Sequence, residues 1–296
     1  MQLYFAGAHH KFYHDYLKER GARFLLSYVN DLKALERYMR EGEGLFFVDS
    51  GAFTAHRKGI EIDVDKYIAW LNDHDTYIHI AAQIDTIPGR FGEVKTPGQL
   101  YEAPRLSWDN YCYMRDRVKH PEKILPIFHQ GEDFTWLLQM LAEKVPYIGI
   151  SPANDVVEAE KEAWLDECWR LILDSDHAQV KTHAFGMTNL RLMEQYPFES
   201  ADSTTWLINS VYGNISTRFG ILSISTRKQE VNPKHIWNQP EAIQQVIKAD
   251  IESMGYTLEE LELAAKKRAM YNADFFLAWA RGYHYRPKLM RQRTLF

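Results

Sequence analysis

The chain has 296 residues, of which 46% are hydrophobic, 14% aromatic and 25% charged. This length fits one large domain or two ordinary ones, and the composition excludes a low-complexity or disordered chain. No run of about 18 apolar residues is present, which excludes a membrane-spanning helix. The start of the chain lacks a basic stretch followed by an apolar core, so we expect no secretory signal. Only Cys112 and Cys168 are present, which is too few for a disulfide framework and predicts a reducing cytoplasm.

The net charge of −5 conceals an uneven distribution along the chain. Residues 264–296 carry a charge of +7, because they contain eight basic residues and a single acid, Asp274. The other 263 residues therefore carry −12. Such a segment is typical either of contact with a phosphate backbone or of a solvated helix and a soluble tail. The basic residues are Lys266, Lys267, Arg268, Arg281, Arg286, Lys288, Arg291 and Arg293.

Eight short runs rich in apolar, β-branched or aromatic residues read as strands, and longer helical patterns separate most of them. The last of the eight is the weakest. In chain order the predicted strands are Leu3–Ala6, Phe24–Tyr28, Leu45–Val48, Tyr77–Ile84, Ile124–Phe128, Tyr147–Ile150, Val180–Ala184 and Glu199–Asp202.

Capping residues mark the helices between and after these strands. Asn30 or Asp31 begins one, Asp133 begins another and Thr188 begins a short one. Residues 203–238 show little periodicity. A helix then begins at Pro240 and stops at Gly255, and residues 257–260 form a capping box for a final helix.

Regular alternation of strands and helices predicts parallel strands joined by crossover helices. Eight strands within about 200 residues favour an α/β fold of the (βα)₈, TIM-barrel type, and a doubly wound open sheet is the main alternative. We expect residues 1–206 to form the barrel. Residues 207–296 are expected to form a helical extension with a basic end, packed on the barrel within a single domain.

Polar residues directly follow the predicted strands, where the loops of a barrel converge on its active site. Asp49, Asp85 and Asp202 would all point into one mouth, with His129 and His183 near the same rim. Each acid alone is equally consistent with helix capping or with chemistry, whereas the coincidence of three favours an enzyme. By residue type, a metal-dependent hydrolase also stays open.

Six segments, taken together and in order, resemble tRNA-guanine transglycosylases. They are VDSGAF at 48–53, QID at 83–85, FHQG at 128–131, YIGI at 147–150, VKTHAFG at 180–186 and YPFESADSTTW at 196–206. The last is the most specific, and it is similar to the nucleophile segment of the viral branch. That branch comprises phage DNA-guanine transglycosylases, which place 7-deazaguanine bases in DNA. The resemblance covers roughly residues 45–206 and implies a (βα)₈ barrel.

Two features depart from the pattern of the tRNA enzymes. Ala52 stands where their first motif has a second glycine, and no cysteine follows Cys168, so their C-terminal zinc site is absent. Because that zinc subdomain helps to place tRNA, the departure favours DNA as the substrate. The resemblance therefore implies no metal and no cofactor, only a free 7-deazaguanine base as co-substrate.

The resemblance implies a pentosyltransferase that replaces guanine in DNA by a 7-deazaguanine derivative through a covalent aspartyl-glycosyl intermediate. Asp202 would be the nucleophile and Asp49 the general acid and base. A tRNA-guanine transglycosylase and a non-catalytic, nucleic-acid-binding relative are the alternatives. The implied substrate-binding residues are Asp85 for the two donors of the base, Gln130 with the backbone N–H of Gly149 or Ile150 for its carbonyl, Phe53 and Phe185 for its faces, and Ser50 and Gly186.

The expected partners are DNA, with its guanine flipped out or single-stranded, and the free base. No membrane partner is expected, a homodimer is left open, and the location would be the host cytoplasm if the protein is viral. Contacts to the DNA backbone are predicted for Arg281, Arg286, Lys288, Arg291 and Arg293, the alternative being a helix packed on the barrel.

Overall fold

The structure is a computed structural model that describes residues 1–42, 44–90, 93–153, 155–187, 189–226 and 232–286. The helix start predicted at Thr188 and the predicted DNA contacts Lys288, Arg291 and Arg293 lie outside the described residues. The chain forms two compact units. Unit 1 comprises Met1–His9, Arg23–Asp202 and the described residues from His284 on, and unit 2 comprises His10–Ala22 and Ser203–Tyr283.

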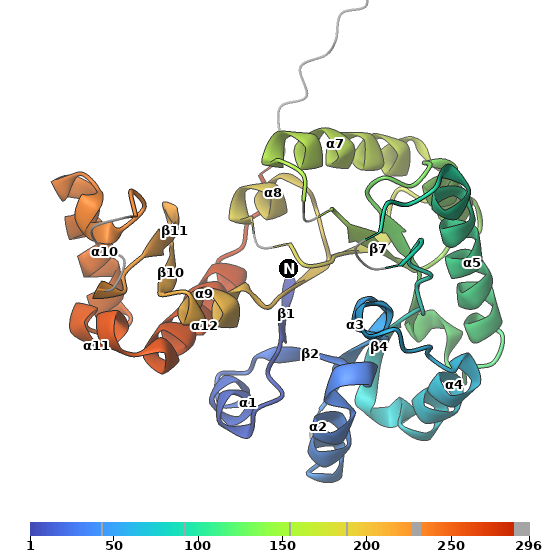
Figure 1. The fold of residues 1–296 in the computed structure, drawn as a ribbon, viewed down its shortest axis with the longest axis horizontal. Helices are drawn as coiled ribbons and strands as arrows, with labels where there is room; N and C mark the ends of the chain where they lie inside the picture. The colour runs from blue at the N-terminus through green and yellow to red at the C-terminus, as the bar shows by residue number, and fades with distance from the viewer. Residues whose placement is uncertain (43, 91–92, 154, 188, 227–231, 287–296) are drawn as a thin grey trace, which may run out of the picture. The chain divides into compact units, whose positions relative to one another are not determined.

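Unit 1 is built on a nine-stranded parallel sheet with the order β5-β4-β3-β2-β1-β9-β8-β7-β6 (Figure 1). Every strand predicted from the sequence is present in this sheet. The strands are β1 (Gln2–Ala6), β2 (Arg23–Ser27), β3 (Phe46–Asp49), β4 (Ile78–Ala82), β5 (Ile124–Leu125), β6 (Ile127–His129), β7 (Tyr147–Ser151), β8 (Lys181–Ala184) and β9 (Ser200–Ser203).

The sheet closes through the segment that the sequence predicts as a single fifth strand. Pro126 divides this segment into β5 and β6, because proline has no N–H to donate to the ladder. β5 pairs with β4, whereas β6 pairs with β7. Around the interruption, the Gln83 N–H donates to Leu125 O (3.0 Å) and the Gly149 N–H donates to Pro126 O (2.8 Å). The eight strand positions thus form a TIM-type barrel, and the open-sheet alternative is wrong.

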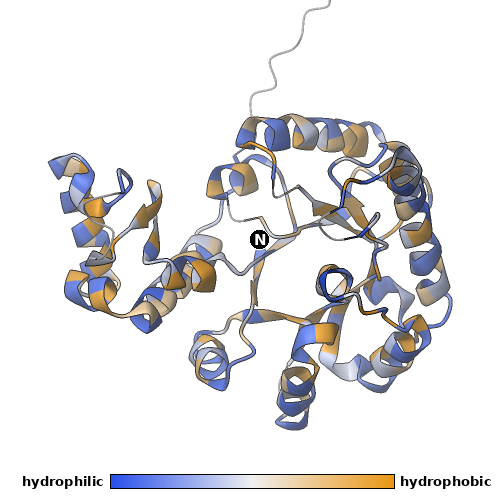
Figure 2. Ribbon diagram, in the orientation of Figure 1, coloured by the Kyte–Doolittle hydropathy of each residue, from blue (hydrophilic) through white to orange (hydrophobic). Residues whose placement is uncertain are grey.

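Helices cover the outside of this barrel (Figure 1). In Figure 2 hydrophilic and hydrophobic residues alternate along these ribbons, which is typical of helices with one buried face. Asn189 accepts from Leu192 N–H and caps the short helix predicted to begin at Thr188. The helices of unit 1 are α2 (Tyr28–Arg40), α3 (Ala52–Lys58), α4 (Val64–Asp73), α5 (Pro97–Arg115), α6 (Thr135–Ala142), α7 (Glu158–Asp174) and α8 (Leu190–Gln195).

The interior of the barrel is filled by side chains from successive strands, as expected for a parallel barrel of this size. The buried cluster takes one residue from most of the strands that supply it and two from β1 and β4, where the two are spaced two apart so that both point inward. Its members are Tyr4, Ala6, Leu25, Phe47, Ile80, Ala82, Leu125, Ile127 and Tyr147, with Phe185 packed against them. The same period of two directs Asp49, His183 and Asp202 inward near the carboxyl ends of their strands.

Unit 2 combines an N-terminal helix with the residues that follow the barrel strands. Its elements are α1 (Lys11–Lys18), α9 (Thr205–Val211), the antiparallel pair β10 (Asn214–Thr217) and β11 (Gly220–Ser223), α10 (Glu241–Ser253), α11 (Leu258–Leu263) and α12 (Ala265–Arg281). Asp274 joins α1 to the rest of the unit: it accepts from Tyr16 OH (2.7 Å) and Tyr256 OH (2.6 Å) and pairs with Arg20 Nε (2.8 Å).

Unit 2 differs from the helical extension expected from the sequence in two respects. Residues 214–223 form a hairpin, which the weak periodicity of 203–238 did not indicate. Helix α1 belongs to this unit, although it precedes the second barrel strand in the chain. That the extension packs on the barrel as part of a single domain stays a prediction. Among the described residues, no helix has both the length and the apolar character needed to span a membrane.

Candidate active site

Three carboxylates lie at the carboxyl ends of barrel strands. Asp49 is the last residue of β3, Asp85 follows β4, and Asp202 lies in β9. Parallel strands end on one side of a barrel, so these residues share its C-terminal mouth. The negative charges of Asp85 and Asp202 both act on Asp49 and raise its pKa. The structure therefore brings together the three acids singled out in the sequence.

Asp49 is poised between its two protonation states near neutral pH. Burial contributes most to a pKa raised to about 7, the charges of Asp85 and Asp202 add to it, and a hydrogen bond opposes it. In that bond the Gly51 N–H donates to Asp49 Oδ2 (3.0 Å). A carboxyl group with a pKa near 7 can both give and take a proton at neutral pH, as a general acid and base must.

The turn after Asp49 requires glycine. Gly51 has φ = 82° and stands at the N-terminus of α3. A Cβ at this position would lie 2.6 Å from Ser27 Oγ and 2.6 Å from Val29 Cβ. Ser50 is buried beside it. The motif at 48–53 thus fixes the direction of the Asp49 carboxylate through the Gly51 N–H.

Asp202 is buried, and two groups lie within hydrogen-bond distance of one of its oxygens. The Gly186 N–H donates to Oδ1 (2.8 Å), and His183 Nε2 lies 3.3 Å from the same atom. Gly186 has φ = 57°, a left-handed conformation that glycine adopts at little cost. Both groups come from the end of β8 and the turn after it. The neighbouring strand therefore orients the carboxylate of Asp202.

His183 continues into a chain of hydroxyl groups inside the barrel. Its Nδ1 lies 2.6 Å from Ser200 Oγ, and that oxygen lies 2.5 Å from Tyr147 OH. His183 and Ser200 are register partners on β8 and β9, which places their side chains side by side on the inward face. Both residues are completely buried. Burial lowers the pKa of His183, although the charge of Asp202 opposes this shift.

Asp85 is held by an amide and by a histidine that itself pairs with a second acid. Gln83 Nε2 donates to Asp85 Oδ1 (2.8 Å), and His129 Nε2 lies 3.4 Å from Asp85 Oδ2. His129 Nδ1 lies 3.1 Å from Glu132 Oε1. Burial alone would lower the pKa of His129, but Asp85 and Glu132 outweigh it and raise the pKa to about 10. His129 is therefore an imidazolium at neutral pH, which places a positive charge beside the Asp85 carboxylate.

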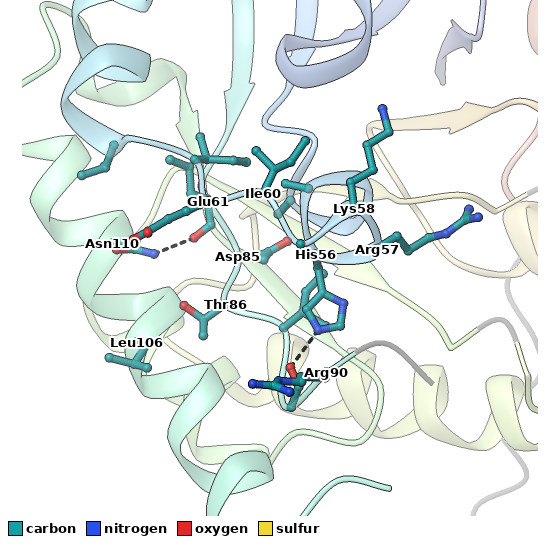
Figure 3. A pocket seen from close by; sticks show the side chains of 18 residues that line it. His56, Arg57, Lys58, Ile60, Glu61, Asp85, Thr86, Arg90, Leu106 and Asn110 are labelled. Atoms are coloured by element: carbon teal, nitrogen blue, oxygen red, sulfur yellow. Dashed lines mark hydrogen bonds between the residues drawn. The ribbon is translucent and has the colours of Figure 1, made fainter. Parts of the chain in front are cut away.

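A pocket of about 860 Å³ opens beside Asp85 (Figure 3). It is lined by α3, by residues 59–64, by the segment after β4 and by one face of α5. His56 Nε2 contacts Gly89 O (2.9 Å), and Asn110 Nδ2 donates to Ile84 O (2.9 Å), so hydrogen bonds join its walls. Arg57 and Lys58 extend from α3 to one side of the pocket. Of the substrate-binding residues predicted from the sequence, Asp85 lines this pocket.

Three predicted substrate-binding residues have other roles in the structure. Gln130 Nε2 donates to Glu160 O (3.3 Å), and its Oε1 accepts from Ala153 N–H (3.0 Å), so its amide holds the loop after β7. The Gly149 N–H donates to Pro126 O, and Ile150 is buried within β7. The predicted contact of the Gly149 N–H with a base carbonyl is not supported, because the sheet already uses this donor.

The two predicted stacking residues differ in their surroundings. The Phe53 side chain is 59% exposed on α3, and the Arg57 guanidinium lies 5.9 Å from the centre of its ring. Phe185 instead packs on the barrel core, edge-to-face against Phe47 (5.7 Å between centroids) and against His183 (4.5 Å). Gly149 makes room for this ring, since a Cβ there would lie 2.6 Å from Phe185 Cε2. Phe185 is therefore packed against the barrel core.

Two of the predicted DNA contacts lie within the described residues. Arg281 Nη2 donates to Arg20 O (2.7 Å) in unit 2. In unit 1 the Arg286 N–H donates to Glu194 O (2.7 Å), and its guanidinium, which is largely exposed, lies 3.7 Å from Glu194 Oε2. Both side chains retain donors that these contacts leave unused.

In the part of the chain that the structure describes, no cluster of three or more His, Cys, Asp or Glu side chains is arranged to hold a metal ion. Sequence reasoning did not single out Glu132, Ser200 or Tyr147. The spacing of His129 and Glu132 within His-Gln-Gly-Glu was a local signal for the first of these. The other two act through pairing between strands, which the sequence does not reveal. Comparison with protein-family models and with characterised proteins gives no match to this chain.

Proposed function

We propose that this protein is a base-exchange glycosyltransferase that replaces guanine in DNA by a 7-deazaguanine derivative. The observation that carries the proposal is the arrangement of three acids in one barrel mouth. Asp202 Oδ1 accepts from the Gly186 N–H and lies 3.3 Å from His183 Nε2, Asp49 has a pKa raised to about 7, and Nε2 of the His129 cation lies 3.4 Å from Asp85 Oδ2. Exchange of a base needs a nucleophile, an acid that becomes a base, and an acceptor for N–H donors.

The first half of the reaction removes guanine. An oxygen of Asp202 forms a bond to the anomeric carbon, while the bond from that carbon to the base nitrogen breaks. The electron pair of the broken bond leaves with the base, which takes the proton of the Asp49 carboxyl group. The products of this step are free guanine, an ionised Asp49 and a sugar linked covalently to Asp202.

The second half reverses the first with a different base. Ionised Asp49 takes a proton from a ring nitrogen of the incoming base, and that nitrogen attacks the anomeric carbon and displaces Asp202. One carboxyl group thus serves as acid and then as base, which suits a pKa near 7. The phosphodiester chain stays intact throughout both steps.

Asp85 is suited to select the base. Guanine and 7-deazaguanine present a ring N–H and an exocyclic amine side by side, and a carboxylate can accept from both. Because His129 and Gln83 hold one oxygen each, Asp85 has a fixed direction. The adjacent pocket of about 860 Å³ lies within the range of ligand sites and leaves room around a base bound at Asp85.

The choice of DNA rests on the resemblance of residues 196–206 to the nucleophile segment of the phage enzymes. The experiment that tests the function supplies guanine-containing single-stranded DNA, duplex DNA or tRNA together with a labelled 7-deazaguanine base. We expect label in DNA and guanine released in equal amount. Transfer to tRNA alone would instead identify a tRNA enzyme, and transfer to none of them would contradict the proposal.

A further inference from the structure

The Tyr147–Ser200–His183–Asp202 chain runs through the barrel interior from the first residue of β7 to the mouth. Each link is within hydrogen-bond distance: 2.5 Å from Tyr147 OH to Ser200 Oγ, 2.6 Å from Ser200 Oγ to His183 Nδ1, and 3.3 Å from His183 Nε2 to Asp202 Oδ1. Its two middle members are completely buried, so solvent does not compete for these contacts.

The surroundings of His183 favour the neutral imidazole. The rings of Tyr4, Phe47 and Phe185 lie around it, with centroids 6.1, 4.5 and 4.5 Å away. Burial among them lowers the pKa of His183, because a charged ring would lose its hydration. A neutral imidazole carries a single proton, so one ring nitrogen donates and the other accepts.

The partners decide which nitrogen holds the proton. An ionised Asp202 can only accept, and the Gly186 N–H already donates to the same oxygen. His183 Nε2 must therefore be the donor, which leaves Nδ1 to accept from the Ser200 hydroxyl. Ser200 in turn accepts from Tyr147 OH, whose pKa burial raises, so the phenol keeps its proton. With the opposite tautomer, a lone pair on Nε2 would face the carboxylate.

We propose that Tyr147 and Ser200 are positioning residues that hold His183 as its Nε2–H tautomer, and that His183 thereby leaves Oδ2 of Asp202 as the attacking oxygen. This role in attack rests on the proposed function. Both hydrogen bonds that reach the Asp202 carboxylate from the described residues go to Oδ1. The bond to the anomeric carbon therefore forms at Oδ2, while the electron pair of the broken bond leaves with guanine and the proton comes from Asp49.

The test combines nuclear magnetic resonance of the histidine side chains with single-turnover kinetics. The full-length protein is labelled with ¹⁵N-histidine, and the His183 signal among the 12 histidines is assigned by its loss in His183→Gln. Ser200→Ala removes the donor to Nδ1, and Tyr147→Phe removes the first link. Thr182→Val is the matched control, because the neighbouring Thr182 is equally buried and its hydroxyl has no hydrogen-bond partner in the described structure.

In the wild-type protein at neutral pH, we expect the His183 ring to carry its proton on Nε2. This measurement needs no substrate. Ser200→Ala should mix the two tautomers and slow covalent attachment of DNA by up to about 100-fold, with KM unchanged, because the carboxylate loses its fixed direction. Tyr147→Phe should have the same effect to a smaller degree. Thr182→Val should change neither the tautomer nor the rate.

Three results separate the inference from the proposed function. A wild-type His183 that is protonated on Nδ1 or on both nitrogens overturns the inference. The Nε2–H tautomer in the wild type together with an unchanged attachment rate in Ser200→Ala overturns the positioning role. The Nε2–H tautomer in a protein that never attaches DNA contradicts the proposed function and the role of Oδ2, while supporting the direction of the hydrogen-bond chain.

Discussion

His129 Nε2 lies 3.4 Å from Asp85 Oδ2, and Glu132 Oε1 lies 3.1 Å from the other nitrogen of the same ring. This arrangement places a half-buried cation beside the acid that is proposed to select the base. The positive charge of His129 thus lies next to one of the three acids that share this mouth. The proposed selection of guanine-like bases therefore depends on residues that need not touch the base.

The first prediction concerns Glu132→Gln. Removing one of the two acids should lower the pKa of His129 from about 10, which a histidine titration by nuclear magnetic resonance would detect. Because the pKa of His129 is higher in the folded protein than in the unfolded chain, its protonation stabilises the fold. This contribution is complete below pH 6.5 and is lost as pH rises through about 10. The stability difference between wild type and variant should therefore be present at pH 6 and should disappear above pH 10.

The control for this prediction is Glu143→Gln, which removes an acid from a surface pair with Arg115. An exposed pair contributes little, so His129 should titrate as in the wild type. A His129 that is already neutral at pH 7 in the wild type would contradict the arrangement.

The second prediction concerns Asp49→Asn, which keeps an acceptor for the Gly51 N–H and removes the charge. A folded-state carboxyl pKa raised from 3.8 to about 7 means that the wild type loses stability as pH rises from about 4 to about 7. The variant should lack this loss. As pH rises across that window, its free energy of unfolding should therefore increase by a few kcal/mol relative to that of the wild type. Urea unfolding at pH 4 and pH 8 measures the difference.

Asp49 also sets the expected pH dependence of catalysis. Covalent attachment needs the protonated form and should slow as pH rises through about 7, whereas transfer to the incoming base needs the ionised form and should show the opposite trend. Single-turnover measurements of each half separate the two. Identical pH profiles for the two halves would exclude Asp49 as a shared acid and base.

The third prediction concerns Gly149→Ala. The new methyl group would lie 2.6 Å from Phe185 Cε2 and 2.9 Å from Leu125 Cδ2, so crowding should cost about 1–3 kcal/mol of stability. Because a smaller side chain relieves this contact, Gly149→Ala combined with Phe185→Leu should be less destabilised than the sum of the two changes. Gly42→Ala, where a Cβ has open space, should combine additively with Phe185→Leu. Thermal or urea unfolding of the five variants tests this.

The fourth prediction separates the two phenylalanines. Phe53→Ala changes an exposed side chain and should leave stability within about 0.5 kcal/mol, while weakening DNA binding by the 1–3 kcal/mol typical of one stacked base, or about 5- to 150-fold. Phe185→Ala should instead destabilise the barrel by about 3 kcal/mol. Unfolding and DNA titrations with Asp202→Asn as background give both numbers. Unchanged affinity in Phe53→Ala would remove it from the base site.

The barrel itself could be predicted from the sequence because its signals are local. Each strand is a short apolar run, and the polar residues that end it fall at the mouth by topology alone. The apolar pattern predicts one strand over Ile124–Phe128 and misses its division at Pro126, although proline lacks the N–H that a central strand position needs. The apolar runs do not show in which register neighbouring strands pair. The contacts that link His183, Ser200 and Tyr147 depend on the register of β8 with β9 and with β7.

Unit 2 shows the other limit of sequence reasoning. The segment His10–Ala22 is held in this unit by Asp274, which accepts hydrogen bonds from Tyr16 and Arg20, more than 250 positions away in the chain. No local pattern records such a contact. For a similar reason the sequence could not show that the Gly149 N–H bonds to Pro126 and that the Gln130 side chain bonds to Ala153 and Glu160, which are distant in sequence.

The most direct test of the central claim is to locate a covalent bond between Asp202 and DNA. The wild type is mixed with a guanine-containing single-stranded oligonucleotide, denatured, digested and analysed by mass spectrometry. We predict an adduct equal to the oligonucleotide minus guanine on the peptide that contains Asp202. It should decrease when a 7-deazaguanine base is added, and it should be absent in Asp202→Asn. An adduct on another residue, or guanine exchange without any adduct in the wild type, would contradict the account.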